Sequence, residues 1–264
     1  MRVALATVRR TARSFLQRFF EFNTRGSATL EQWLRVESDK PLWSRFDAMV
    51  LESLEALPDG GKFVDLGGGR RCVFAPAVPR GRGVRLISVD ISAEELALNH
   101  VADDVMVADV STGLPFGDGE VDLLISRALF EHVDGVPAAV EHIARVIKPG
   151  GRTIHFMPCR NALFALVARL LPFEPLLELL HLADPSTIGQ AEFDVHYDHT
   201  EPRAIAKLFR AAGFRNVRVE WTAAQADYFK AVTPLYILVA LFQMVVGKLR
   251  VSWLSAYLIV SAER

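Results

Sequence analysis

The chain contains little cysteine. Only Cys72 and Cys159 occur among its 264 residues. Two isolated cysteines form neither a disulfide framework nor the Cys-x-x-Cys pairs of a zinc site, so a disulfide-rich secreted domain and a zinc ribbon are excluded. Unpaired cysteines are ordinary in reducing compartments, and the cytoplasm is therefore the expected location.

Basic charge is not in excess either. The 30 Lys and Arg residues nearly balance 31 Asp and Glu residues, which gives a formal net charge of −1. Sequence-independent binding of nucleic acid depends on many Lys and Arg contacts to phosphates. A nucleic-acid substrate is therefore disfavoured, and we predict no nucleic-acid partner.

The first twenty residues lack acidic side chains and lack a long apolar run. Every apolar stretch is interrupted by one of five arginines, namely Arg2, Arg9, Arg10, Arg13 and Arg18. The uninterrupted apolar core of a secretory signal is thus missing. Arginines mixed with Leu, Val and Phe predict a basic amphipathic helix instead. Two uses remain open for this helix: a lid packed on the domain, and a weak contact with a membrane surface.

The chain does have enough apolar residues, 51%, for one large core. From Lys62 onward, short apolar runs alternate with helical patterns, which is typical of βαβ units and of a parallel sheet covered on both faces. Strands are expected at residues 62–66, 84–89, 105–108, 121–126, 152–157, 214–221 and 254–262. The predicted fold class is α/β, with a doubly wound, mostly parallel, seven-stranded sheet and helical lid insertions.

Local signals mark the ends of two helices. Ser92 and Glu95 have capping-box spacing, which predicts a short helix between the second and third strands. Farther along, Thr200 can cap a helix that has Pro202 in its first turn. Gly213 can end that helix in the left-handed conformation.

The chain is expected to form one domain with lid segments. Residues 1–60 are predicted to be an N-terminal helical lid on a cofactor-binding domain at 61–264. A Leu-rich insertion at about 159–200 is predicted to cover the substrate. The uncharged stretch between Lys230 and Lys248 is at the short limit of roughly 17 to 25 residues for a membrane span. Spanning would separate the last strand from its sheet, so we expect a helix that is buried on the domain or lies partly in the membrane interface.

A glycine-rich turn is the most informative local motif. Residues 64–70 read Val-Asp-Leu-Gly-Gly-Gly-Arg between the first strand and the next helix. Glycines permit left-handed dihedrals and let a ligand approach the backbone closely. A nicotinamide fingerprint would need a third glycine at position 72, which is Cys. A phosphate-binding Walker loop is excluded because no Gly-Lys-Ser/Thr follows.

Acidic residues then follow the strands in order. Asp65 precedes the glycines, Asp90 ends the second strand, and Asp109 ends the third. With this order the chain resembles the class I S-adenosylmethionine-dependent methyltransferases, particularly the subgroup with an Asp-x-Gly-x-Gly motif. The resemblance implies that Asp90 accepts both ribose hydroxyls and that Asp109 lies near the adenine amino group. It places the cofactor, S-adenosylmethionine, against Asp65, Gly67, Gly68, Gly69, Asp90, Ile91, Asp109, Val110 and Ser126.

Two further features bear on this resemblance. Residues 114–116, 131–133 and 147–151 match the family's later motifs. One position departs from it, because Arg71 replaces the glycine that often follows. A long side chain there is expected to narrow the loop.

Methyl transfer from a sulfonium needs few catalytic groups, since positioning supplies much of the acceleration. An oxygen acceptor still benefits from a base that titrates near neutrality. The candidates are His132, His155, Tyr197 and His199. For each of them a structural role is the alternative, as a packed or hydrogen-bonded residue. The Asp and His spacing at 194–199 matches no dedicated metal site, so no metal is predicted.

The region after Pro158 is similar to bacterial methyltransferases of polysaccharide and glycolipid biosynthesis. This resemblance implies a small-molecule, sugar or lipid-linked acceptor, and we predict O-methylation. Nitrogen and carbon acceptors remain open. The rival functions are a cofactor-binding module without turnover and a nicotinamide-dependent oxidoreductase.

Overall fold

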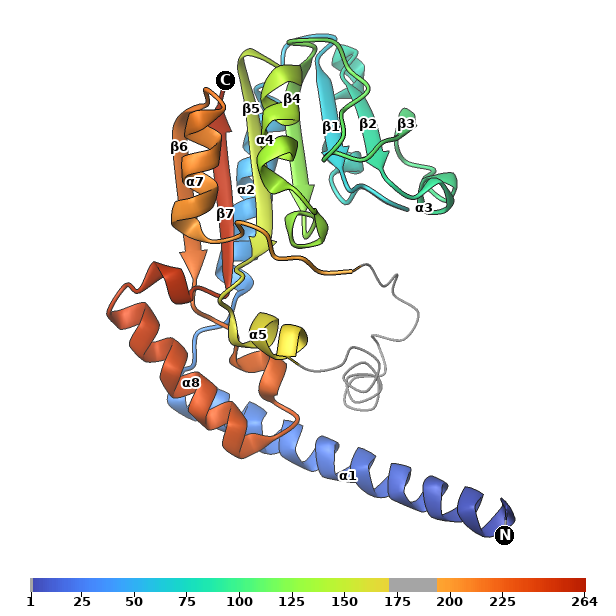
Figure 1. Cartoon of the computed structure of the whole chain (residues 1–264), viewed down its shortest axis with the longest axis vertical. Helices are drawn as coiled ribbons and strands as arrows, with labels where there is room; N and C mark the ends of the chain where they lie inside the picture. Colours follow the sequence, from blue (N-terminus) through green and yellow to red (C-terminus); the bar gives the residue numbers. More distant parts are fainter. Residues whose placement is uncertain (1, 171–193) are drawn as a thin grey trace. The chain divides into compact units, whose positions relative to one another are not determined.

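The computed structural model describes residues 2–170 and 194–264, and it describes the side chains from Leu16 onward, except at Ala168. Seven strands form one sheet in the order β3-β2-β1-β4-β5-β7-β6 (Figure 1). Strands β1 to β5 pair in parallel, and β7 pairs antiparallel with both β5 and β6. The strands are β1 Lys62–Leu66, β2 Arg85–Asp90, β3 Asp104–Val107, β4 Val121–Arg127, β5 Ile147–Pro158, β6 Arg215–Thr222 and β7 Tyr257–Glu263. The predicted fold class is confirmed.

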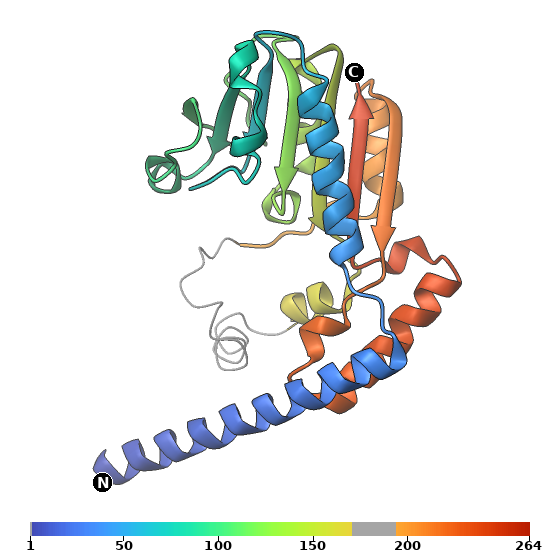
Figure 2. The same ribbon diagram turned by 180° about the vertical axis from the view of Figure 1, so that it is seen from behind.

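Helices cover both faces of this sheet. Helix α2 (Lys40–Glu55) lies on one face, and α4 (Val136–Val146) and α7 (Pro202–Ala211) lie on the other (Figures 1 and 2). The strands between them are buried on both sides; Phe63, Leu124 and Ile154, for example, are at most 1% exposed. A short helix, α3 (Ala93–Ala97), follows β2. The C-terminal ends of β1 and β2, where the acidic residues were predicted, therefore sit on a rigid core.

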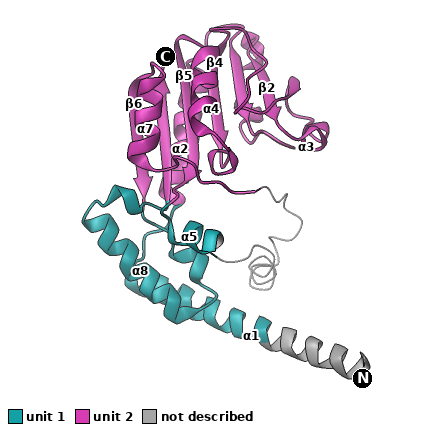
Figure 3. Ribbon diagram, viewed as in Figure 1, with its two compact units in different colours: residues 1–39, 161–193, 223–256 teal, residues 40–160, 194–222, 257–264 magenta. Residues whose placement is uncertain are grey.

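The chain divides into two compact units (Figure 3). The sheet unit comprises residues 40–160, 194–222 and 257–264. The helical unit comprises residues 1–39, 161–193 and 223–256, of which 171–193 lie outside the described residues. The division differs from the expected lid boundary at residue 60, because α2 packs on the sheet. Its Trp43 ring lies 3.8 Å from the Phe156 ring, centroid to centroid.

The predicted insertion at 159–200 is also divided. Residues 161–170 belong to the helical unit and 194–200 to the sheet unit. The stretch between them, where most of the covering role was predicted, falls outside the described residues. That role therefore stays a prediction.

The local helix signals had different outcomes. Ser92 caps α3, and its side chain accepts a hydrogen bond from Glu95 N at 3.1 Å, as predicted. Gly213 follows α7 with a φ of +90°, also as predicted. The cap at Thr200 is wrong. Glu201 is the N-cap of α7, without a side-chain cap bond, and Thr200 Oγ1 is buried with no hydrogen-bond partner among residues 2–170 and 194–264.

The helical unit contains α1 (Arg2–Leu34), α5 (Leu163–Leu170) and α8 (Thr233–Lys248), with the 3-10 turns η5 (Ala226–Phe229) and η6 (Ser252–Leu254). Helices α1 and α8 lie side by side in both views (Figures 1 and 2). Thr233 Oγ1 donates to Asn23 O at 3.0 Å, and Ser27 Oγ donates to Lys230 O at 3.0 Å. Among the helices of residues 2–170 and 194–264, none is long and apolar enough to cross a membrane.

A buried glutamine holds the middle of the helical unit. Gln243 on α8 is 3% exposed, and its Oε1 accepts from the backbone N–H groups of Gln225 and Ala226, both at 2.8 Å. Its Nε2 donates to Glu37 O at 2.8 Å. Because every polar atom of this amide is used, one polar residue is accommodated on the buried side of an otherwise apolar helix.

Candidate cofactor and acceptor site

The glycine turn after β1 requires glycine at two adjacent positions. Gly67 has a φ of +73°, and its N–H donates to Val89 O at 2.7 Å. A Cβ at Gly68 would lie 2.6 Å from Ser88 Oγ and 2.9 Å from Asp65 O. The first position needs the left-handed conformation, and the second has no room for a side chain. The backbone at this turn is therefore open to close approach by a ligand.

Asp90 is tied directly to this turn. Its Oδ2 accepts from Gly69 N at 3.0 Å, and its Oδ1 accepts from Ser92 N at 2.9 Å. A carboxylate oxygen has two lone pairs, so each oxygen can accept one more hydrogen bond from a ligand hydroxyl. Ile91, the next predicted cofactor contact, is 60% exposed. A fixed, partly exposed carboxylate beside an exposed apolar side chain suits a ribose carrying a flat ring.

Asn99 supports the turn and was missed by sequence reasoning. Its Nδ2 donates to Gly69 O at 2.8 Å and to Ser88 Oγ at 3.0 Å. Its Oδ1 accepts from the backbone N–H groups of Val101 and Ala102. A single asparagine after a short helix gives no signal of this role in the sequence, because its partner Gly69 lies 30 residues earlier.

Asp65 lies beneath the turn and is buried. Burial raises the pKa of its carboxyl to about 6, while the Cys72 thiol and the nearby Arg127 charge act in the opposite direction. Burial and the neighbouring Asp65 charge also raise the pKa of Cys72 far above its usual range. The predicted cofactor residue Asp65 is thus paired with a thiol inside the protein, where it supports the glycines from below.

Asp109 and Val110 follow β3, whose last residue Val107 pairs with Asp90, and Ala108 N donates to Asp90 O at 2.9 Å. Asp109 Oδ1 accepts from Ser111 N at 2.8 Å and from Ser111 Oγ at 2.7 Å. Val110 is buried, and His142 Nδ1 donates to its carbonyl at 2.8 Å. The structure therefore brings together the acids that the sequence placed at the ends of neighbouring strands.

Two predicted site residues turn inward, and both predictions need correction. Ser126 Oγ and His155 Nδ1 are 2.8 Å apart, and both residues are fully buried. His155 Nε2 lies 2.5 Å from Thr153 Oγ1. Burial lowers the pKa of His155 to about 3. With both ring nitrogens bound to hydroxyls inside the core, His155 cannot serve as a base for an acceptor, and the Ser126 hydroxyl is not available to a cofactor.

Glu131, in the 3-10 turn η3 (Phe130–His132), was matched to a family motif but was not among the predicted site residues. The side chain is buried, and its Oε2 has no hydrogen-bond partner in the described part of the chain. Burial raises the pKa of this carboxyl to about 8. The backbone carbonyl of Glu131 accepts from the N–H groups of His196 and Tyr197, at 2.7 and 3.0 Å. A desolvated acid at the C-terminal end of β4 is typical of functional sites.

The other two candidate histidines, His132 and His199, each have one fixed tautomer when the ring is neutral. His132 Nδ1 lies 2.8 Å from Asp194 O, and a carbonyl can only accept, so this nitrogen carries the proton. His199 Nδ1 likewise donates to Asp198 Oδ1. In both rings Nε2 is then the basic nitrogen. The His132 side chain is 29% exposed and the His199 side chain 44% exposed.

The segment that carries His199 is held under strain. Tyr197 and His199 both have a φ of +52°, a conformation that non-glycine residues seldom adopt. Asp198 Oδ2 accepts from Val136 N, at the first residue of α4, at 3.2 Å. Tyr197 is buried, at 6% exposed, whereas His199 is accessible. The structure thus orients one accessible imidazole with a carboxylate that is itself anchored to a helix N-terminus.

Comparison with known proteins identifies the family. A family model described as a methyltransferase domain matches residues 7–219. The chain belongs to the methyltransferase domain family. A demethylmenaquinone methyltransferase of Mycolicibacterium gilvum is 27% identical over 174 residues, which cover 63% of this chain and 73% of the relative. An uncharacterized methyltransferase of Mycobacterium sp. (strain JLS) is 33% identical over 102 residues, 38% of this chain and 40% of the relative.

A third relative is the biotin biosynthesis bifunctional protein BioHC of Cellvibrio japonicus. It is 32% identical over 108 residues, which cover 40% of this chain and 21% of the relative. The chain therefore spans less than half the length of this relative and of the Mycobacterium sp. relative.

Solved methyltransferases share the fold. An S-adenosylmethionine-dependent methyltransferase from Archaeoglobus fulgidus superposes with a TM-score of 0.53 at 16% identity, covering 89% of this chain and 98% of that chain. Phosphoethanolamine N-methyltransferase 2 of Haemonchus contortus, solved with S-adenosyl-L-methionine, gives 0.51 at 16% identity, with 84% of this chain and 52% of that chain covered. The family match confirms the predicted enzyme class, a methyltransferase, and the Haemonchus contortus structure holds the predicted cofactor, S-adenosyl-L-methionine.

The departure from the family pattern at Arg71 does not narrow the turn. The Arg71 side chain is exposed, and its backbone is not among the positive-φ residues. This position therefore has no need of glycine. The guanidinium of the preceding residue, Arg70, binds the Glu95 carboxylate at 2.6 and 2.8 Å.

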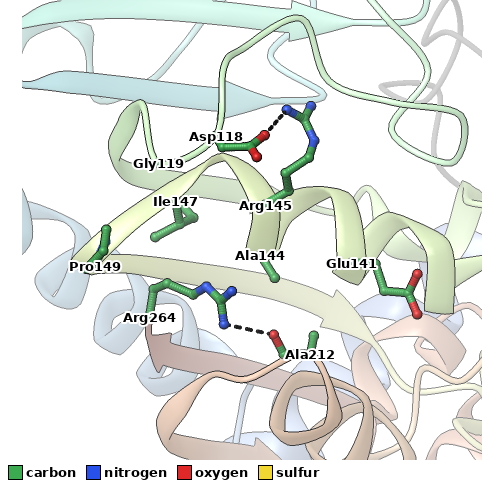
Figure 4. A pocket seen from close by; sticks show the side chains of 9 residues that line it. All are labelled: Asp118, Gly119, Glu141, Ala144, Arg145, Ile147, Pro149, Ala212 and Arg264. Carbon is green, nitrogen blue, oxygen red and sulfur yellow. Dashed lines mark hydrogen bonds and ion pairs between the residues drawn. The ribbon is translucent and has the colours of Figure 1, made fainter.

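A cavity elsewhere in the methyltransferase domain lacks the features of a site. It lies at the N-terminal ends of β4 and β5, whereas Asp90 lies at a C-terminal strand end (Figure 4). Arg145 in its wall donates to Asp118 and to the carbonyls of Phe116 and Leu114. Arg264 donates to Ala212 O. Both guanidinium groups that line the cavity are thus already bound to protein acceptors. In the described part of the chain, no group of three His, Cys, Asp or Glu residues could hold a metal ion.

Proposed function

We propose that this protein transfers a methyl group from S-adenosylmethionine to an oxygen atom of a small-molecule, sugar or lipid-linked acceptor. The observation that carries the proposal is the joining of Asp90 to the glycine turn through Gly69 N. A carboxylate held at this point, with lone pairs left over, is suited to accept both ribose hydroxyls of the cofactor. The oxygen acceptor rests on the histidine geometry described above.

The residues of the turn fit the cofactor. Gly67 and Gly68 leave a cradle that a Cβ would fill, and Asn99 holds the turn in place. Asp90 would hold the ribose, Asp109 would lie toward the adenine amino group, and Ile91 and Val110 would contact the ring. When bound, S-adenosylmethionine supplies a methyl group activated by its sulfonium.

His199 is the proposed base. Its Nδ1–H donates to Asp198, so its Nε2 can accept the proton of an acceptor hydroxyl. Asp198 fixes the ring and stabilises the imidazolium that results, as the third group does in nucleophile–base–acid arrangements. His132 is the second candidate, with Glu131 Oε1 3.9 Å from its Nε2. Tyr197 anchors the segment through its bond to the Glu131 carbonyl, and its side chain is buried.

Binding of the cofactor tests the first half of the proposal. Asp90→Ala should weaken binding of S-adenosylmethionine and of its demethylated product by roughly tenfold to a hundredfold, because the loss of two charge-assisted hydrogen bonds together costs about 1.5 to 3 kcal/mol. Asp118→Ala is the matched control, since its side chain is 84% exposed and lies by the cavity at the other end of the strands. Calorimetry that detects no binding of either ligand to the unchanged protein would refute the proposal.

Turnover tests the second half. Metabolites and lipids from cells with and without the gene, compared by mass spectrometry, should differ by one methyl group in the acceptor. With that acceptor, His199→Gln should lower kcat by about a hundredfold or more, whereas His196→Gln, an exposed neighbour, should leave it unchanged. Asp198→Asn should lower kcat and alter its pH profile. Equal activity of the His199 and His196 variants would exclude this base.

Carbon methylation is a second candidate, favoured by the names of the relatives. Two mycobacterial relatives are demethylmenaquinone methyltransferases, and one from Desulfotalea psychrophila is a ubiquinone/menaquinone biosynthesis C-methyltransferase. The mass-spectrometry experiment separates the two, because a methyl on carbon survives chemical cleavage of ethers. Cofactor binding with no transfer to any cellular acceptor would instead indicate a binding module without turnover. Bound nicotinamide would revive the oxidoreductase.

Contact with a membrane surface is a further part of the proposal. The sequence left such a contact open for the basic N-terminal helix, beside a role as a lid, and the backbone there is helical from Arg2. The side chains of Arg9, Arg10 and Arg13 lie outside the described residues, so their contact with a membrane stays a prediction. Replacing all three with Glu should release the protein from anionic vesicles if this helix contributes.

A further inference from the structure

Helix α8 has two sides of opposite environment. Its buried residues are Tyr236, Val239, Ala240, Gln243 and Val246. Its large exposed apolar residues, with the first residue beyond its end, are Leu235, Leu238, Leu241, Met244, Val245 and Leu249, each 41% to 67% exposed. We call this second set the outer face of α8. At 3.6 residues per turn, these positions occupy one half of the helix circumference along its whole length.

The outer face carries no charge over most of its length. From Val232 to Gly247 the sequence contains no Asp, Glu, Lys or Arg. Soluble proteins seldom expose contiguous apolar patches of this extent, and such patches mark sites of interaction. A solvated surface helix would instead place polar residues on its outward side. The outer face therefore calls for a covering partner.

The charges beside the outer face indicate which partner. Lys248 and Arg250 at the end of α8 are exposed, and Trp253 just beyond them is 57% exposed. Two acids of the helical unit, Glu31 and Asp227, both pair with Lys230, at 2.8 and 3.0 Å, which offsets one of their two negative charges. Leucines bordered by Lys, Arg and an exposed Trp have the composition of a segment that lies at a lipid interface.

We propose that the outer face of α8 is the surface by which this protein lies on an anionic lipid bilayer. The helix would lie in the plane of the interface, with its leucines in the acyl boundary and Lys248 and Arg250 at the headgroups. It differs from the basic N-terminal helix, which the proposal does not require. Such contact would bring the enzyme to a lipid-linked acceptor, and this consequence alone rests on the proposed function.

The test uses the full chain and vesicles of phosphatidylcholine, with and without phosphatidylserine. Leu238→Gln/Leu241→Gln should weaken sedimentation with phosphatidylserine vesicles by about tenfold or more, because two leucines leave the acyl boundary. The control is Leu51→Gln/Leu98→Gln, which changes two leucines of the sheet unit with 41% and 50% exposure. This control should sediment as the unchanged protein does.

A second pair of variants tests the charges. Lys248→Glu/Arg250→Glu should remove the preference for phosphatidylserine and the sensitivity to salt, because the attraction to headgroups is electrostatic. Arg203→Glu/Lys207→Glu on α7 makes the same change of charge at exposed residues of the sheet unit. It should retain the preference.

Three results would overturn the proposal. The first is an unchanged protein that stays in the supernatant with every vesicle at low salt. The second is an α8 leucine variant that sediments as well as its control, which would leave the N-terminal helix as the attachment. The third is a dimer in sedimentation equilibrium that the α8 leucine variant dissociates, since a second copy would then cover the outer face. Calorimetry with S-adenosylmethionine on each variant separates these outcomes from a failure to fold or to bind cofactor.

Discussion

Replacing Glu131 with Gln should make the protein less stable in mild acid and more stable in mild alkali. In the folded protein, burial raises the pKa of this carboxyl to about 8, from an ordinary value of 4.5. The folded state thus keeps a proton that the unfolded state releases. Stability from this group is fully present below about pH 4.5 and is lost as pH rises to about 8. The glutamine side chain has nearly the same shape and does not ionise.

The magnitude follows from the difference in pKa. Each pKa unit corresponds to 1.36 kcal/mol, so ionising Glu131 costs the folded state at most about 5 kcal/mol above pH 8. The variant has a cost of its own. Its amide places a donor near the buried position of Oε2, where the described residues offer no partner. An unsatisfied buried donor of this kind costs roughly 1 to 3 kcal/mol of stability. The variant should therefore be less stable than the unchanged protein by up to about 2 kcal/mol near pH 5, and more stable by roughly 2 to 4 kcal/mol near pH 9.

Urea unfolding at several values between about pH 5 and pH 9 measures this difference. Subtracting the two proteins at each pH removes the titration of every other group. The two stability curves should cross between about pH 5 and pH 7. Parallel curves would show that Glu131 titrates normally in the folded protein, and the reasoning from its burial would then fail.

Three further predictions concern other buried groups. Gly68→Ala should destabilise by about 1 to 3 kcal/mol and weaken cofactor binding, since its Cβ would lie 2.6 Å from Ser88 Oγ; an unchanged melting temperature would contradict this. Thr200→Val should be neutral or stabilise by up to about 1 kcal/mol in thermal unfolding, because Thr200 Oγ1 has no partner to lose. The pKa of His155 is about 3 in the folded protein, against 6.5 for an ordinary histidine, so the unfolded state binds a proton at a higher pH than the folded state does. The free energy of unfolding should therefore fall as pH drops from about 6.5 toward 3. His155→Phe should flatten this fall in urea unfolding, and an equally steep fall in the variant would show that other groups cause it.

The sequence was sufficient where the signal is local. A glycine's dihedral freedom and an acid's place at the end of a strand depend on a few adjacent residues, so the turn and Asp90 could be placed before the structure. Ser126 and His155 could not be, because a strand buried on both faces reads as continuously apolar and does not reveal which way each side chain points. Both turned toward the core.

Other features depend on residues far apart in sequence. The backbone carbonyl of Glu131, for example, accepts from the N–H groups of His196 and Tyr197, 65 and 66 residues later. The lid boundary at residue 60 was drawn where the strand pattern begins, but the pattern of a helix does not indicate what it packs against. Helix α2 packs on the sheet, and the boundary was therefore too late.

The place of β7 in the sheet has a consequence for the order of synthesis. Among the described strands, β7 lies between β5 and β6, and β6 has no other neighbour. While the chain emerges from a ribosome, β6 therefore has no partner to pair with until residues 257–263 have also appeared. Helix α8, which carries the outer face, lies between β6 and β7 in the chain and therefore emerges in this interval. The nascent chain would thus expose the apolar outer face of α8 before β6 and β7 can pair. During this time a nearby bilayer or a chaperone could bind that face.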